Sequence, residues 1–128
     1  MNILVTGAAG FIGSHLVTRL IASRDHQVIG IDNLSNGNLA NLDHISDWRA
    51  KYFEQVDLLD YEKLIPFVKG QDIIFHLAAK GSVPLSFIYP DEFFDNNMIG
   101  TQNLLLLMRH FKIPKIVFAS SSSVYGDH

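Results

Sequence analysis

Short apolar runs recur along the chain, and each is separated from the next by a longer polar or amphipathic stretch. The first run, residues 2–6, is rich in β-branched side chains and is followed at once by glycine, which is typical of a buried parallel strand. Later runs have the same character or alternate apolar and polar positions. The predicted strands are residues 2–6, 27–31, 51–56, 72–77 and 115–119.

Between these runs, apolar residues recur at helical spacing. Residues 11–21 predict a first helix, and a short amphipathic stretch surrounds Leu42. Asp60 is a suitable N-cap for a further helix, which Pro66 should kink or shorten. A long helix is predicted over residues 90–111, because proline and two acids at its start suit a helix N-terminus.

The predicted long helix is apolar on more than one side. Residues 104–107 are apolar nearly all round, so burial on a second side is expected beside the main stripe. Gly100 in mid-helix costs roughly 1 kcal/mol relative to alanine and so indicates close packing. The stripe consists of Phe94, Met98, Thr101, Leu105 and Met108.

Strands that alternate with helices predict an α/β fold with a right-handed, doubly wound parallel sheet in the order 3-2-1-4-5, ending at the fifth strand. Residues 1–128 then form one domain. Ligands of such sheets bind at the carboxyl ends of the strands, and small or polar residues follow those ends here. They are residues 7–13, Asp32, Asp57, residues 78–81 and residues 120–123.

Composition narrows the class of protein. Hydrophobic residues make up 48% of the 128 and charged residues 18%, as in a packed globular domain. The net charge is −3 with no basic run, which argues against nucleic acid or an anionic membrane surface as partner. The chain has no cysteine and no apolar run near 18 residues. We therefore expect a cytoplasmic protein with no membrane, nucleic-acid or metal partner.

Gly7, Gly10 and Gly13 stand between the first strand and the first helix, the context that a dinucleotide fingerprint requires. Gly7 lets the chain turn sharply, Gly10 lets the backbone approach a pyrophosphate, and Gly13 lets the helix lie close to the sheet. The first helical turn would then face the phosphates. A nucleotide-triphosphatase loop is excluded because no lysine follows these glycines. A purely structural turn is the alternative.

Asp32 lies at the expected tip of the second strand, roughly 20 residues after Gly13. An acidic residue at this place accepts hydrogen bonds from both hydroxyls of a ribose, and its charge would repel a 2′-phosphate. The spacing therefore predicts NAD in preference to NADP. A helix cap or a carboxylate that solvates the following loop is the alternative interpretation.

Other residues near the same rim allow two interpretations. His76 lies in an apolar strand with no partner at metal-ligand spacing, which favours a core histidine over a ligand or a base. Asn96 and Asn97 on the long helix could hydrogen-bond a strand end or the cofactor, or could be surface amides. Residues 78–84 are small enough to pass close beneath a cofactor.

Six stretches carry these features in order: residues 5–15, 32–37, 57–58, 76–79, 96–101 and 120–127. Together they resemble the extended short-chain dehydrogenases/reductases, and more closely their NAD-dependent epimerase/dehydratase branch. The resemblance covers essentially the whole chain and implies a Rossmann-type fold. Residues 82–90 and the ending 123–128 are most similar to UDP-N-acetylglucosamine, UDP-glucose or UDP-glucuronate 4-epimerases.

The resemblance implies NAD as cofactor and a nucleotide sugar as substrate. In that family NAD oxidises the sugar C4 hydroxyl and returns the hydride to the other face of the 4-keto sugar. The implied pyrophosphate residues are Gly7, Gly10, Phe11, Ile12 and Gly13; those at the ribose are Asp32, Asn33, Ser35, Asn36 and Gly37; those at the adenine are Asp57 and Leu58; and the remaining lining is Leu77, Ala78, Ala79, Lys80 and Asn96.

Ser121, four residues before Tyr125, matches the family's catalytic serine or threonine, which hydrogen-bonds the reacting hydroxyl; an ordinary loop serine is the alternative. The family's base is the tyrosine of a Tyr-x-x-x-Lys helix. No tyrosine here is followed by a lysine four positions later. The resemblance therefore implies the N-terminal, cofactor-binding part of an epimerase, without that helix and without the substrate domain.

Two other classes of protein remain open. The missing Tyr-Lys pair favours a non-catalytic dinucleotide-binding regulator or scaffold, and the first half would also fit a Rossmann reductase with another substrate. The last strand and the long helix both lack neighbours in this scheme. We therefore expect a homodimer or a larger assembly.

Overall fold

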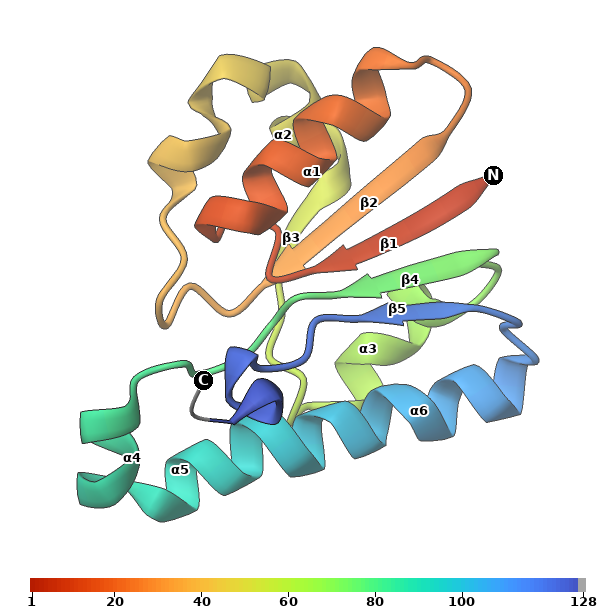
Figure 1. Ribbon diagram of the computed structural model, residues 1–128. Coiled ribbons are helices and arrows are strands. Elements are labelled where there is room, and N and C mark those ends of the chain that lie inside the picture. Colours follow the sequence, from red (N-terminus) through yellow and green to blue (C-terminus); the bar gives the residue numbers. More distant parts are fainter. Residues whose placement is uncertain (127–128) are drawn as a thin grey trace.

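The computed structural model describes residues 1–126, and its centre is a five-stranded, all-parallel sheet (Figure 1). The order β3-β2-β1-β4-β5 confirms the predicted topology and the α/β class. Thr6 pairs with Ile31 on one side and His76 on the other, so the carboxyl ends of the central strands meet at one edge. The strands are β1 Asn2–Thr6, β2 Gln27–Asp32, β3 Phe53–Gln55, β4 Ile73–His76 and β5 Ile116–Phe118.

Helices cover both faces of the sheet (Figure 1). α1 (Phe11–Ala22), the 3-10 helix η1 (Leu39–Ile45) and α2 (Ser46–Tyr52) lie on one face. α3 (Tyr61–Val68) and α6 (Gly100–Phe111) lie side by side on the other. This is the doubly wound arrangement that the alternating sequence pattern predicts.

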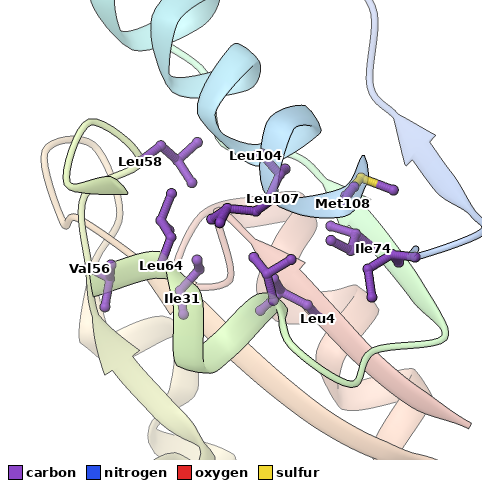
Figure 2. Packing of buried hydrophobic residues seen from close by; sticks show 11 residues of the cluster. Leu4, Ile31, Val56, Leu58, Leu64, Ile74, Leu104, Leu107 and Met108 are labelled. Carbon is purple, nitrogen blue, oxygen red and sulfur yellow. The ribbon is translucent and has the colours of Figure 1, made fainter. Parts of the chain in front are cut away.

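Alternate residues of β1 belong to cores on opposite faces of the sheet. Ile3 and Val5 pack on the α1 side, whereas Leu4 joins a larger cluster with α3 and α6. Burying each leucine contributes roughly 1.5–3 kcal/mol, so this cluster fixes α6 against the sheet. Its labelled members in Figure 2 are Leu4, Ile31, Val56, Leu58, Leu64, Ile74, Leu104, Leu107 and Met108.

The third strand is shorter than predicted, because residues 51–52 belong to α2, a helix that the sequence pattern did not predict. Trp48 anchors this helix to the sheet. Its indole N–H donates to the Val28 carbonyl at 2.9 Å, and a Cβ on Gly30 would lie 2.7 Å from its ring. The contact of Trp48 with β2 therefore outweighs the strand-like alternation of residues 51–56, and residues 51–52 are helical.

The predicted helix over residues 90–111 is irregular. α5 (Pro90–Phe94) passes through a π-helical turn, η2 (Asp95–Ile99), into α6. A π turn widens the helical repeat, so the predicted stripe does not stay on one face. Of the predicted stripe, Phe94, Met98 and Leu105 are exposed and only Met108 is buried. The burial expected on a second side is found at Leu104 and Leu107.

Two smaller predictions agree with the structure. Asp60 caps α3, since its side chain accepts a hydrogen bond from the Lys63 N–H at 3.3 Å, and the helix ends at Val68, shortly after Pro66. Gly100 is buried at the start of α6, where a Cβ would lie 2.9 Å from the Leu58 Cβ.

α4 (Val83–Ile88) was not predicted. Its apolar side chains Val83, Leu85, Phe87 and Ile88 are exposed, so the helix has no buried face for a sequence pattern to reveal. Within residues 1–126, none of the helices combines the length and apolar character needed to cross a membrane.

Candidate functional site

The glycine turn between β1 and α1 depends on the absence of side chains. Gly7 has a φ of +73°, and a Cβ there would lie 2.8 Å from the Ala78 nitrogen. A Cβ on Gly13 would lie 2.0 Å from the Gly7 oxygen. A Cβ on Gly10 would meet only that same oxygen, at 3.2 Å, and otherwise face a cleft. Gly7 and Gly13 therefore allow the close packing of the turn, and Gly10 keeps the cleft open.

The N-terminus of α1 faces this cleft. Gly10 is its N-cap and has no side chain that could accept hydrogen bonds from the first turn, whose N–H groups lack partners within the helix. The helix dipole adds positive charge at this end. Phe11 and Ile12 are 77% and 66% exposed, and Phe11 lines the cleft. The arrangement suits a phosphate group.

Asp32 is held rigidly at the end of β2 and is only 8% exposed. Its Oδ2 accepts a hydrogen bond from the Ala9 N–H at 3.0 Å, and its Oδ1 accepts one from the Leu34 N–H at 2.8 Å. A Cβ on Gly37 would lie 2.7 Å from Oδ1, so the following loop closes tightly around the carboxylate. Asp32 thus holds its loop, as the alternative interpretation proposed, and also borders the cleft.

A first cleft lies between the glycine turn, the loop after β2 and the loop after β4. Most residues predicted to bind the cofactor line it: Gly7, Gly10, Phe11, Asp32, Asn33, Ser35, Asn36, Gly37, Leu58, Leu77, Ala78, Ala79 and Asn96. Sequence reasoning missed three further lining residues, Thr6, Ile31 and Val56. Each lies within one residue of a strand's carboxyl end, which is the signal that could have found it.

The other predicted cofactor residues lie next to this cleft. Gly13 packs behind the turn. Asp57 supports Asn33, because its Oδ2 accepts a hydrogen bond from the Asn33 amide at 3.0 Å. Ile12 is exposed on α1, and Lys80 faces a second cleft.

The second cleft lies between the loop after β4, the long helix and the segment after β5. Ala78 and Ala79 line both clefts and so form the strip between them. Ser121 lines the second cleft, where its Oγ accepts a hydrogen bond from the Ser123 N–H at 3.1 Å and caps the 3-10 helix η3 (Ser122–Tyr125). Asp127, in the same predicted motif, lies outside the described residues.

Asn97 holds the loop after β4 at two points. Its Oδ1 accepts a hydrogen bond from the Lys80 N–H at 2.8 Å, and its amide donates to the Lys80 carbonyl at 3.0 Å. The Lys80 ammonium pairs with Glu92 at 2.6 Å. Within the π turn, Asn96 lines the first cleft and Asn97 lines the second. Neither is a free surface amide.

His76 is a core histidine, as its apolar strand predicted, and is 2% exposed. Both ring nitrogens have partners: Nδ1 lies 2.7 Å from the Thr6 hydroxyl, and Nε2 lies 2.8 Å from the Thr101 hydroxyl. Burial lowers the pKa of His76 from 6.5 to about 4. The ring is therefore neutral near pH 7.

The sheet order, the glycine turn and the buried acid after β2 define a Rossmann-type α/β domain. Comparison with known proteins then gives the family. The model of the NAD dependent epimerase/dehydratase family matches residues 3–128, and the chain belongs to that family.

Individual relatives are longer than this chain. Protein CapI of Staphylococcus aureus is 40% identical over 98% of the chain and 39% of its own length. The crystal structure of UDP-glucose-4-epimerase from Stenotrophomonas maltophila with bound NAD and formylated UDP-arabinopyranose has a TM-score of 0.87 at 34% identity, covering 100% of this chain and 39% of that one. The structure of UDP-N-acetylglucosamine 4-epimerase from Methanobrevibacter ruminantium M1 in complex with UDP-N-acetylmuramic acid has a TM-score of 0.82 at 39% identity. The match covers 99% of this chain and 40% of that one. The chain thus spans about two fifths of these relatives.

Proposed function

We propose that these 128 residues are the NAD-binding portion of a nucleotide-sugar epimerase/dehydratase that acts at C4 of a UDP-sugar. Membership of the family supports the reaction class, and the names of the two solved relatives support a UDP-sugar. We further propose that the chain corresponds to the N-terminal part of such an enzyme, with the grip on the sugar nucleotide supplied by additional residues.

The observation that carries this proposal is the buried carboxylate of Asp32 beside the glycine turn. Each of its oxygens accepts one backbone hydrogen bond, and an ionised carboxylate oxygen has a further lone pair for a ribose hydroxyl. The pyrophosphate would lie against Gly10 and the first turn of α1, and the adenine near Leu58. NAD fits the donors and acceptors that line the first cleft.

The second cleft would receive the nicotinamide and the sugar. NAD, when bound, supplies the acceptor and donor of the hydride. Ser121 orients the reacting hydroxyl, since its own O–H can donate while its oxygen accepts from the Ser123 N–H. Ala78 and Ala79, which separate the clefts, have no long side chain that would block passage of the cofactor between them.

Cofactor choice tests this proposal. We expect the chain to bind NAD more tightly than NADP. Asp32→Ala should weaken NAD binding at least about 100-fold, because two hydrogen bonds to a charged group are lost, at about 1.5–3 kcal/mol each. NADP binding should fall less, because the same change removes the repulsion of the 2′-phosphate. Calorimetric titration with both dinucleotides measures these differences.

Asp72→Ala is the matched control. Asp72 also accepts a backbone hydrogen bond, from the Asn2 N–H at 2.7 Å, but at the opposite end of β1. It should leave the preference for NAD unchanged. Equal or tighter binding of NADP by the unaltered chain would overturn the proposal, provided that circular dichroism shows the chain to be folded.

We also propose that the chain associates as a homodimer or larger. Apolar side chains are exposed along α4, the long helix and β5, with Phe87 82% exposed, and large exposed apolar patches mark interaction surfaces. Light scattering at tens of micromolar, a roughly chosen concentration suited to weak interfaces, should give at least twice the monomer mass of 14.4 kDa. Phe94→Ser with Met98→Ser should lower this mass, and a monomer from the unaltered chain would contradict the proposal.

A further inference from the structure

A chain of hydrogen bonds runs from β1 through His76 to the long helix, and its directions can be assigned. The Thr101 hydroxyl donates to the Asn97 carbonyl at 2.6 Å. Because a hydroxyl has one hydrogen, Thr101 must accept from His76, whose Nε2 lies 2.8 Å away. Nε2 therefore carries the ring proton.

The other end of the chain follows from this tautomer. In a neutral ring with the proton on Nε2, Nδ1 is an acceptor, so the Thr6 hydroxyl donates to it across 2.7 Å. The Thr6 oxygen in turn accepts from the Ala78 N–H at 3.3 Å. Burial, which lowers the pKa of His76 to about 4, keeps the ring neutral at pH 7.

One end of this hydrogen-bond chain reaches the strip between the two clefts, and the other reaches Lys80, which follows that strip. Ala78, at one end, lines both clefts. Asn97, at the other, holds the N–H and the carbonyl of Lys80 with its side-chain amide. His76 itself is not among the residues that line either cleft, so any effect on a ligand must pass through these neighbours.

We propose that His76 is a positioning residue for residues 78–80, which are the strip between the clefts and the adjacent Lys80, and that it acts as the Nε2–H tautomer through Thr6 and Thr101. The strand end and the π turn are thereby locked to each other, and Asn97 is held where it clamps Lys80. A histidine that only filled space in the core would need neither a fixed tautomer nor the Thr101 hydroxyl. The ligand-binding part of the test rests on the proposed function; the tautomer does not.

The tautomer can be read directly. Long-range 1H–15N correlation spectra of the 128-residue chain at pH 7 should show the His76 ring protonated at Nε2 with Nδ1 as an acceptor, and His76→Gln identifies the signal by its loss. A ring protonated at Nδ1, or a mixture of the two tautomers, would overturn the proposal whether or not the chain binds NAD.

Thr101→Val removes the hydroxyl link, and Thr101→Ser keeps it. Without ligand, Thr101→Val should shift the amide signals of Ala78 and Lys80, and Thr101→Ser should restore them. In a fluorescence titration with NADH, Thr101→Val should weaken binding by about tenfold, the scale of one lost hydrogen bond, while Thr101→Ser stays within about twofold.

Thr18→Val is the matched control, because the Thr18 hydroxyl also donates to the carbonyl four residues earlier, Ser14, and contacts a histidine, His44, away from both clefts. It should leave the Lys80 amide and NADH binding unchanged. If Thr101→Val behaved like Thr18→Val in both readouts, the positioning role would be wrong. If the unaltered chain did not bind NADH, the proposed function would fail, while the tautomer and the amide shifts would still decide the role of His76.

Discussion

Alanine in place of Gly13 is expected to destabilise the fold strongly, whereas alanine in place of Gly10 is expected to leave its stability intact and weaken NAD binding. A Cβ on Gly13 would lie 2.0 Å from the Gly7 oxygen and 2.8 Å from its carbonyl carbon, so α1 would have to move off the turn. Overpacking usually costs about 1–3 kcal/mol; against backbone atoms we expect at least about 3 kcal/mol, out of roughly 5–15 kcal/mol for a whole domain.

Gly10 has a φ of −74°, which any residue can adopt, and a Cβ there would have only one neighbour, at 3.2 Å. Alanine at such a site stabilises a protein by about 0.4–1 kcal/mol, since the unfolded chain loses freedom. The added methyl group would nevertheless occupy the place where a pyrophosphate must approach the backbone. We expect NAD affinity to fall at least about tenfold.

Urea unfolding followed by circular dichroism measures the first effect, and calorimetric titration with NAD measures the second. Each variant is the control for the other, because both make the same chemical change in the same turn. Equal stability of Gly13→Ala and the unaltered chain, or unchanged NAD affinity of Gly10→Ala, would show that the roles assigned to these glycines are wrong.

The sheet could be predicted from the sequence because its determinants are local. A central parallel strand is buried on both faces, so the middle of each predicted central strand, residues 3–5 and 73–75, is a continuous apolar run. The glycine turn needs specific residues at fixed positions. The order of the strands then followed from the handedness of the connections. Asp32 was found in the same way, since its distance from the glycine turn is set by one βαβ unit.

What could not be predicted depends on contacts between distant segments. α2 is stabilised by Trp48 packing on Gly30 across to β2, and nothing within residues 46–52 indicates that contact. The π turn has no local signature either, yet it changes which side of the long helix is buried.

Features of the second cleft also depend on contacts between distant segments and could not be predicted from the sequence. Lys80 was predicted as a cofactor residue, but its clamp by Asn97 required the strand end and the long helix to come together. Thr101 was interpreted only as part of an apolar stripe, whereas its hydroxyl links His76 to the π turn. A polar hydroxyl within an apolar helix face was the signal that could have found it.

The 128-residue chain on its own is expected to show no epimerase turnover. The reaction needs a base within hydrogen-bond reach of the sugar hydroxyl, and general-base catalysis is typically worth about 10²- to 10⁴-fold. Ser121 can orient that hydroxyl, but an unassisted serine does not ionise near neutral pH. Lys80 is paired with Glu92 and has no free lone pair when protonated.

Neither His76 nor His128 is expected to act as the base. His76 is 2% exposed, both of its ring nitrogens are engaged, and its pKa of about 4 makes it a weak proton acceptor at pH 7. His128 lies outside the described residues, and we do not expect it to substitute. Poor orientation of the substrate should lower the rate further, because proximity can contribute about 7–11 kcal/mol and, under the proposed function, additional residues supply the grip on the sugar nucleotide.

An epimerase assay tests this expectation. The substrates are UDP-N-acetylglucosamine, UDP-glucose and UDP-glucuronate, NAD is supplied, and the products are separated by chromatography. The control is Ser121→Ala, which should be as inactive as the unaltered chain and should still bind NAD, because Ser121 does not line the first cleft, where the adenosine and pyrophosphate are proposed to bind. Turnover by the unaltered chain that disappeared in Ser121→Ala would mean that a base exists among these 128 residues, and that they form a complete catalyst rather than the cofactor-binding portion of one.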